Sequence, residues 1–356
     1  MNQVTIDYPT NLDIPAAWYG PKMASNPHLW TYNLTATDIR ELENAVQTFK
    51  QTQKPLGHIS KYDFPLDNLG NILNGLKKEL LLGRGFQLLK GLPVNNYSTE
   101  ICAIMFCGIG SYLGSARSQN SSGHLLGHVR DTGADEKNFK TRIYQTNARQ
   151  SFHTDSCDAV GLLCLKKARK GGSSMLASSV TAYNEIAKKR PDLLPSLFKP
   201  VAYDRRGENK KEEQEFFTIP VFNWFKNHLT CIYHRTYIDS AQRFEDAPKL
   251  TPEQKEVLDL LDELLNDPTI HFEMELDPGD LQFVYNHNLL HDRNAYTDWP
   301  KLKDRRHLFR LWLSLPNDRP LPPVFSQRYG ELTIGNRGGI FTEETTLHAP
   351  IDDWII

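Results

Sequence analysis

The chain has 356 residues, of which 39% are hydrophobic, so it is long enough to bury a large core, and we expect one elaborated domain over residues 1–356. Its 41 Lys and Arg residues nearly balance its 43 Asp and Glu residues. The resulting net charge of −2 gives no electrostatic reason to expect a nucleic-acid or membrane partner, and a small-molecule substrate is favoured instead. The oligomeric state is not visible in the sequence.

The N-terminal residues and the cysteines both indicate a cytoplasmic protein. Residues 1–13 have neither the basic nor the apolar part of a signal peptide, and no apolar run is long enough to span a membrane. The cysteines are odd in number and lack CxxC spacing, so we interpret them as buried, reduced thiols. They are Cys102, Cys107, Cys157, Cys164 and Cys231.

The first third of the chain predicts an arm followed by helices. Residues 1–33 are rich in Pro, Asn and aromatic residues without a clear period, and we interpret them as an N-terminal arm. Residues 115–133 are polar and Gly-rich, and they predict a long loop that lines a pocket, with Asn120 and His128 as candidate substrate contacts. Between these segments, apolar spacing predicts helices over 35–50, 66–82 and 98–110 and a strand over 86–89.

Strands dominate the rest of the chain, which favours an α+β fold with a mainly β core flanked by helices. A double-stranded β-helix, or jelly roll, fits this order of elements, with its core and insertions over 80–315 and a C-terminal tail over 316–356. The charged run 204–215 is interpreted as a solvated excursion without chemistry. Strands are expected over 142–147, 160–165, 174–178, 216–224, 229–235, 270–276, 281–285 and 307–315, and helices over 181–189 and 251–265.

The stretch 151–156, Ser-Phe-His-Thr-Asp-Ser, places an imidazole and a carboxylate two residues apart. In an extended strand, His153 and Asp155 point to the same face and can reach one metal ion. A second, distant His would complete the facial triad of non-haem Fe(II) oxygenases. His287 and His291 both follow the strand 281–285, and spacing alone does not choose between them.

Further motifs follow the His153–Asp155 pair in a fixed order. A Gly-Gly-Ser-Ser segment stands at 171–174, a Pro-Gly-Asp turn at 278–280, a late His at 287 or 291, and Arg310 on the last strand. This order resembles the taurine dioxygenase and 2,4-D dioxygenase type of Fe(II)/2-oxoglutarate oxygenases, with clavaminate synthase as a relative. The resemblance covers roughly residues 80–315.

The resemblance implies a cofactor, two cosubstrates and their ligands. Fe(II) would be held by His153, Asp155 and His291, the last selected by the family pattern His-x-Arg. Arg310 would bind the distal carboxylate of 2-oxoglutarate, with Ser174 supplying the hydroxyl that the family usually takes from Thr. Dioxygen is the second cosubstrate, and succinate and CO2 are products.

The same resemblance implies oxidation of a C–H bond in a small substrate such as an amino acid or another carboxylate. Hydroxylation, desaturation and cyclisation, such as aziridine formation, all remain open. Candidate substrate contacts are Gln145 and Asn147 on the strand leading to His153, and Arg337, Ile340 and Phe341 in a tail segment that either folds over the pocket or simply packs.

Two other classes of protein compete with this interpretation. A zinc hydrolase would use the same ligands, but it has no need for Arg310 on a core strand, and the HExxH motif is absent from the sequence. A non-catalytic jelly-roll protein that binds a small molecule would not turn over 2-oxoglutarate.

Overall fold

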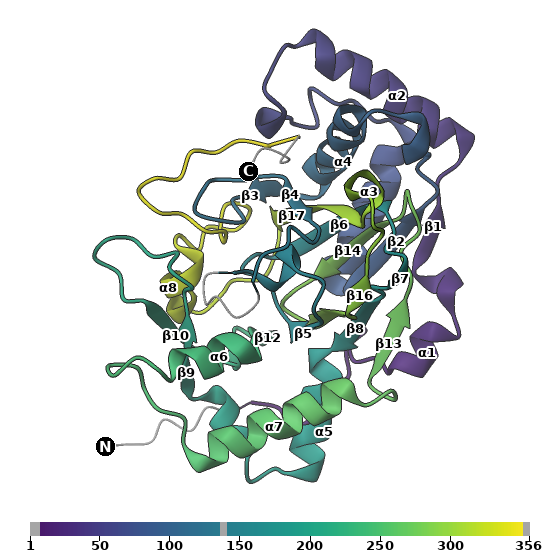
Figure 1. Ribbon diagram of the computed structural model, residues 1–356. Coiled ribbons are helices and arrows are strands. Elements are labelled where there is room, and N and C mark those ends of the chain that lie inside the picture. The colour runs from purple at the N-terminus through teal and green to yellow at the C-terminus, as the bar shows by residue number, and fades with distance from the viewer. Residues whose placement is uncertain (1–7, 136–140, 352–356) are drawn as a thin grey trace.

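The computed structural model describes residues 8–135 and 141–351, which form two stacked β-sheets between layers of helices (Figure 1). The larger sheet has seven strands in the order β1-β2-β14-β6-β17-β3, with β4 also paired to β17, and the smaller has four in the order β13-β8-β15-β5. The larger sheet comprises β1 (Thr31–Asn33), β2 (Phe86–Lys90), β3 (Ser115–Arg117), β4 (Gly127–Val129), β6 (Ala159–Lys166), β14 (Leu281–Tyr285) and β17 (His307–Ser314). The smaller comprises β5 (Gln150–His153), β8 (Ser174–Ser178), β13 (His271–Met274) and β15 (Leu289–Arg293).

Helices and short strand pairs surround the two sheets. The α-helices are α1 (Gly20–Ala24), α2 (Ala36–Gln51), α3 (Asn68–Leu82), α4 (Thr99–Leu113), α5 (Ser179–Lys189), α6 (Arg235–Ala241), α7 (Pro252–Asn266) and α8 (Ser326–Tyr329). The strand pairs are β7 (Lys170–Gly171) with β16 (Tyr296–Thr297), β9 (Pro200–Asp204) with β10 (Phe216–Pro220), and β11 (Phe222–Phe225) with β12 (His228–Cys231). Short 3-10 helices are η1 (Pro27–Leu29), η2 (Leu56–His58), η3 (Val94–Asn96), η4 (Ile143–Gln145), η5 (Leu194–Phe198), η6 (Leu302–Asp304) and η7 (Pro323–Phe325).

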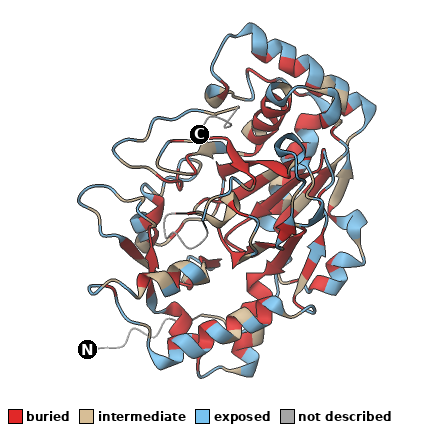
Figure 2. Cartoon of the chain, in the orientation of Figure 1, coloured by how far each residue is buried: buried red, intermediate tan, exposed pale blue. Residues whose placement is uncertain are grey.

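Each sheet has one face against helices and one face against the other sheet. Helices α2, α3 and α4 cover the outer face of the larger sheet, and α5 and α7 cover the smaller one. The strands are buried along most of their length (Figure 2). The described part of the N-terminal arm closes the edge of the inter-sheet core, where Trp18 and Trp30 pack on Phe86 and Phe272. The prediction of a mixed fold with β-sheets flanked by helices is confirmed.

Strand alternation decides which side chains lie between the sheets. Successive residues of a strand point to opposite faces. In β17, Phe309 and Leu311 pack under the helices, whereas Leu308 and Trp312 belong to the core between the sheets. Arg310 lies between these two inward residues in register, so its side chain also enters the space between the sheets. A polar site can therefore form inside an otherwise apolar core.

Local capping signals agree with the predicted helices. The predicted cap at Thr251 is present, because the Gln254 N–H donates to Thr251 Oγ1 at 3.2 Å and the Gln254 side chain accepts from the Thr251 N–H at 3.1 Å. Ser98 likewise accepts from the Ile101 N–H at the start of α4. These side chains satisfy backbone donors that a helix start leaves unpaired.

Four sequence interpretations differ from the structure. Residues 142–147 contain the 3-10 helix η4 rather than a strand, and residues 115–133 contain the short strands β3 and β4. Strand β15, which carries His291, was not predicted because its sequence Leu-Leu-His-Asp-Arg has no apolar alternation. The run 204–215 is not wholly solvated, since Asp204 and Arg205 are buried. Asp204 accepts hydrogen bonds from Ser240 and Arg243, partners that the sequence alone does not place beside it.

The expectations about cysteines and membrane spans have structural counterparts. All five cysteines are buried free thiols, as predicted. Within residues 8–135 and 141–351, no helix has both the length and the apolar character needed to cross a membrane.

Candidate iron and cosubstrate site

His153, Asp155 and His291 converge between the two sheets. Strands β5 and β15 pair so that His153 lies directly opposite His291, with ring centroids 4.2 Å apart. Asp155 follows β5 by two residues, and its Oδ1 and Oδ2 lie 3.8 Å from His153 Nε2 and 3.7 Å from His291 Nε2. Ligand atoms of the three residues all lie within 4.8 Å of one another. One metal ion fits this cluster.

The protonation states of this cluster suit a divalent metal. Burial lowers the pKa of His153, and burial followed by the nearby His153 lowers the pKa of His291 to about 3. Burial raises the pKa of Asp155. Arg310 and the two imidazoles lower it by a larger amount, so the net pKa lies below the usual range of a carboxyl group. Two neutral imidazoles and one carboxylate are the donor set of the Fe(II) facial triad.

Two further contacts orient these ligands. His153 Nδ1 donates to the Ser151 carbonyl at 2.8 Å, which leaves the Nε2 lone pair as an acceptor, and the Gln150 amide lies 2.8 Å from this Nε2. Trp312 Nε1 donates to Asp155 Oδ2 at 2.8 Å, so the indole fixes the carboxylate. Both contacts support a metal-binding role for the residues they hold.

The indole contact gives a testable prediction. Trp312→Phe removes the hydrogen bond but keeps an aromatic ring, and we expect it to weaken Fe(II) affinity by about 10- to 100-fold, as is typical for partners of metal ligands. A competition titration with a chromogenic chelator under argon measures this change. An affinity equal to that of the wild type would show that Asp155 needs no such support.

His287 lies in a different buried cluster. Its Nε2 is 2.9 Å from Asp158 Oδ1, and Asp318 lies close to both residues. Arg337 donates to Asp158 at 2.8 Å and to Asp318 at 2.9 Å, so a guanidinium already neutralises these carboxylates. Of the two candidate histidines, the geometry therefore favours His291 as the metal ligand.

Arg310 stands at the metal end of the inter-sheet space. Its Nη1 is 3.5 Å from Asp155 Oδ2, and its Nε donates to Gln119 Oε1 at 2.7 Å. The guanidinium lies over the rings of Tyr144 and Trp312, with 4.6 and 5.1 Å to their centroids. Gln119 comes from the predicted loop 115–133, so this loop does reach the site, through a residue other than Asn120 or His128.

A narrow cavity of about 40 Å³ is lined by His153 and His291 but not by Asp155. His153, His291 and Arg310 lie on its walls near the metal cluster, and Ser174 and Arg306 also line it. Ser174 Oγ donates to Gln282 Oε1 at 3.2 Å, so its hydroxyl is held in place. The cavity therefore brings the predicted residues Arg310 and Ser174 together with the triad.

Arg306 is a buried cation in this cavity that sequence reasoning missed. It is 6% exposed, its Nη1 has no hydrogen-bond partner, and no carboxylate of the described residues lies within 4 Å of its guanidinium. Gly172 makes room for it, because a Cβ there would lie 3.1 Å from Arg306 Nε. Arg306 stands four residues before Arg310. In an extended chain, side chains four residues apart point to the same side, so this spacing could have predicted Arg306 as a site residue.

A second narrow cavity, of about 30 Å³, opens on the other side of Asp155. Tyr144, Gln150 and Arg310 line both cavities, so the two meet at the metal cluster. The second cavity has aromatic, cationic and hydroxyl walls, which include Arg142, Ser156, Tyr203, Phe217, Tyr237 and Arg328.

Four of the predicted substrate contacts lie outside both cavities. Gln145 caps η4 by accepting from the Arg142 N–H at 3.2 Å, and Asn147 is exposed, because the chain coils here instead of forming a strand. Asn120 Oδ1 accepts from the His124 N–H at 3.2 Å and closes a local turn. His128 points to the far side of β17, where its Nδ1 lies 2.9 Å from His307 Nε2.

The predicted contacts in the tail are packing residues. Arg337 is fully buried in its ion pairs with Asp158 and Asp318. Ile340 joins the core between the sheets, and the Phe341 ring lies 5.1 Å from the Arg117 guanidinium. The tail nevertheless contributes to the second cavity through Arg328, a residue that the sequence did not single out.

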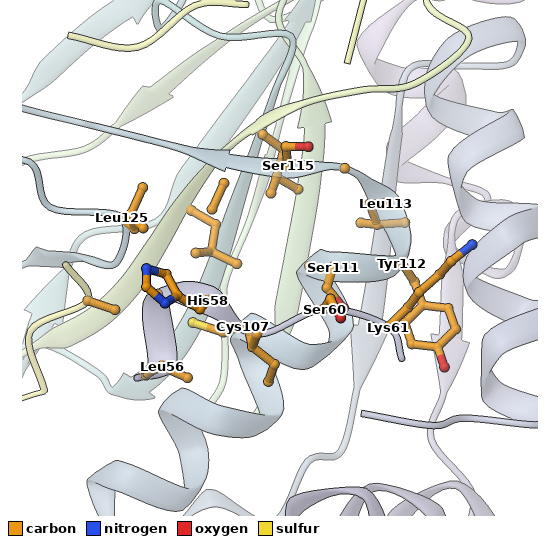
Figure 3. A pocket seen from close by; sticks show the side chains of 18 of the residues that line it. Leu56, His58, Ser60, Lys61, Cys107, Ser111, Tyr112, Leu113, Ser115 and Leu125 are labelled. Atoms are coloured by element: carbon orange, nitrogen blue, oxygen red, sulfur yellow. The ribbon is translucent and has the colours of Figure 1, made fainter. Parts of the chain in front are cut away.

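A separate cavity of about 450 Å³ lies between α4, the η2 segment and the start of β3 (Figure 3). Its walls include His58, Cys107, Tyr112 and Leu125, and none of the triad residues is among them. It lies on the helix-covered side of the larger sheet, so we do not assign the metal chemistry to it.

Comparison with known proteins identifies the family. Residues 48–312 match the model of the family described as taurine catabolism dioxygenase TauD, TfdA family. The chain belongs to this family. Members of the TauD, TfdA family are Fe(II)- and 2-oxoglutarate-dependent dioxygenases, and this chain is one of them, as the resemblance predicted.

Individual relatives of this TauD, TfdA family member agree with that assignment. FR-33289 synthase of Streptomyces rubellomurinus is 32% identical over 310 residues, which are 85% of this chain and 90% of that protein. Taurine hydroxylase-like protein SAT17 of Stachybotrys chartarum is 30% identical over 305 residues, or 83% of this chain and 77% of the relative.

Solved structures share the fold. An asparagine oxygenase in complex with Fe(II), hydroxyasparagine and succinate has a TM-score of 0.62 at 16% identity, covering 80% of this chain and 93% of its own. The non-haem iron oxygenase OrfP with Fe and α-ketoglutaric acid has a TM-score of 0.61 at 13% identity, with the same coverage.

Proposed function

We propose that His153, Asp155 and His291 hold the Fe(II) of this dioxygenase and that it oxidises a C–H bond of a small substrate. The observation that carries this proposal is the convergence of two neutral imidazoles and one ionised carboxylate at the junction of two cavities. Three protein ligands leave other coordination positions free. When bound, iron and 2-oxoglutarate supply the oxidising chemistry, with O2 consumed and succinate and CO2 released.

The two cavities suggest how the ligands divide the space. We assign 2-oxoglutarate to the cavity that contains Ser174 and Arg306, and the substrate to the one that contains Arg142 and Arg328. The two stacked sheets are consistent with a double-stranded β-helix whose core spans residues 80–315, in which the cavity that contains Ser174 lies between the sheets.

Arg306 is the residue that we assign to the distal carboxylate of 2-oxoglutarate, together with the Ser174 hydroxyl. Arg310 lies beside Asp155. This position is closer to the 2-oxo acid end of the cosubstrate, which would chelate the metal, than to the distal carboxylate at its other end. Arg306 has an unpartnered, buried guanidinium nitrogen, which a carboxylate can satisfy by a charge-assisted hydrogen bond. This assignment keeps the predicted role of Ser174 and replaces Arg310 by Arg306 as the arginine that binds the distal carboxylate.

Arg306→Gln tests this assignment. We expect the dissociation constant of 2-oxoglutarate to rise by about 100-fold, because a charged hydrogen bond is lost in a buried place, while Fe(II) affinity stays unchanged. Anaerobic titration of the Fe(II) protein with 2-oxoglutarate measures the constant. Arg305→Gln is the matched control, since Arg305 is a partly exposed neighbour that donates to the Trp299 carbonyl. Tight binding by Arg306→Gln would return the distal carboxylate to Arg310.

The proposed substrates are small amino acids or other carboxylates. This class agrees with the narrow second cavity and with the hydroxyasparagine and hydroxyarginine ligands named for the structural neighbours. Hydroxylation, desaturation and ring closure, including aziridine formation, begin with oxidation of a C–H bond, and product analysis by mass spectrometry separates them.

Anaerobic reconstitution with Fe(II) and 2-oxoglutarate tests the function as a whole. We expect a visible charge-transfer band from the chelate, followed by succinate formation when air and substrate are admitted. Folded protein that gives no such band and binds zinc tightly instead would overturn the proposal.

A further inference from the structure

The second cavity has an unusual charge for a site that adjoins a metal cluster. Three guanidinium groups line it, from Arg142, Arg310 and Arg328, but among the described residues the only carboxylate on its walls is that of Asp155. Asp155 is already committed to the metal cluster. The remaining walls are mostly aromatic and hydroxyl side chains, which add hydrogen-bond donors but no negative charge.

Arg328 is the least compensated of these cations. It is 8% exposed, its Nε donates to Ser156 Oγ at 2.8 Å, and its guanidinium lies over the Phe217 ring. No carboxylate among residues 8–135 and 141–351 lies within 4 Å of it. Burial, and then the like charges of Arg142 and Arg205, lower its pKa to about 9. A cation in such surroundings is stabilised by any anion that enters the cavity.

The charges around Arg328 do not cancel. Arg142 forms an ion pair with Glu208 and donates to the Tyr237 hydroxyl at 2.9 Å. Within residues 8–135 and 141–351, five guanidinium groups gather here with three carboxylates, so two positive charges are in excess among the described residues. The groups are Arg142, Arg205, Arg206, Arg243 and Arg328 on one side and Asp204, Glu208 and Glu213 on the other.

We propose that this cavity binds a doubly charged tetrahedral oxyanion of the substrate, a phosphonate or phosphate monoester, with Arg328 and Arg142 as anchors. The inference rests on the proposed function and narrows it: among small acidic substrates, the end held in this cavity is a dianion rather than a carboxylate. A lone carboxylate needs only one planar guanidinium fork. Two separate guanidinium groups, with the hydroxyls of Ser156 and Tyr237 beside them, match an anion that has three oxygens and two charges.

Seating the anion here also orients the substrate. Asp155 and Arg310 line the same cavity, so a carbon chain attached to the anion points toward the metal cluster. Arg328 and Arg142 therefore act as specificity-determining residues that hold one end of the substrate while its other end reacts.

Binding of matched probes to the anaerobic Fe(II)·2-oxoglutarate complex tests the inference. The probes are propylphosphonate, ethyl phosphate, propanesulfonate and butyrate, and calorimetry gives their affinities. We expect propylphosphonate or ethyl phosphate to bind about tenfold or more tightly than propanesulfonate and butyrate, since the second charge adds a charge-assisted interaction. The better of the two identifies the phosphonate or the ester as the natural head group. Equal affinity for butyrate and both dianions would overturn the inference.

Variants locate the binding site. Arg328→Gln is expected to lose about tenfold or more of the dianion affinity and Arg328→Lys to retain part of it, whereas Arg190→Gln, an exposed control, is expected to change nothing. The charge-transfer band with 2-oxoglutarate reports that each variant is folded. If Arg328→Gln does not fold, the wild-type preference among the probes still decides. Unchanged dianion affinity in folded Arg328→Gln would refute the assignment. Loss of the band in the wild type would instead refute the proposed function.

Discussion

Replacing His291 with alanine is expected to abolish succinate formation, with a fall in rate of about a thousandfold or more. The variant removes a direct ligand, so the loss should exceed the 10- to 100-fold that is typical for the partners of ligands. Rates of succinate release at saturating Fe(II) measure the effect, and circular dichroism checks that the chain is folded. A variant that keeps the charge-transfer band at normal Fe(II) concentrations would remove His291 from the metal site.

His287→Gln is the matched comparison, because His287 is the other histidine that the sequence allowed. It contacts Asp158, not Asp155, so we expect the variant to bind Fe(II) with wild-type affinity and to lose stability instead. The opposite pattern, with activity lost in His287→Gln and kept in His291→Ala, would exchange the two assignments.

Replacing Arg337 with alanine is expected to lower the free energy of unfolding by about 3–5 kcal/mol, the range for breaking a buried ion pair. Arg337 is fully buried, and its removal leaves Asp158 and Asp318 as unpaired charges in the core. Urea denaturation of the metal-free protein measures the change. Arg305→Ala, at a partly exposed position, is expected to cost no more than about 0.5 kcal/mol. A loss below about 1 kcal/mol for Arg337→Ala would mean that water or rearrangement compensates the two carboxylates.

The residues that the sequence could place are those governed by short-range geometry. The two-residue spacing of His153 and Asp155 and the ordered motifs after them were enough to predict the His153–Asp155 pair, Ser174 and Arg310 as site residues. Arg306 was within reach of the same reasoning, since it stands four residues before Arg310 and lines the same cavity. His291 needed the family pattern, because nothing in the sequence around it predicts the strand that carries it.

The residues that the sequence could not place depend on long-range partners. From its sequence context, Arg337 was a candidate substrate contact. Its guanidinium instead forms an ion pair with Asp158, 179 positions earlier in the chain. Arg328 meets Ser156 across 172 positions. Local patterns carry no information about such pairs, so the sequence could not distinguish the arginine that packs from the arginine that enters the cavity.

The tail that carries these two arginines also contacts the segment after Asp155, the proposed metal ligand. Gly339 N–H donates to the Ser156 carbonyl at 2.8 Å, and Arg337 and Arg328 hold Asp158 and the Ser156 hydroxyl. Because the tail contacts both the second cavity and the segment after Asp155, we expect that replacing it with the tail of a relative would change substrate specificity, Fe(II) affinity and thermal stability together. Libraries aimed at new substrates should therefore vary Arg328 and its neighbours individually while the residues around Arg337 stay fixed.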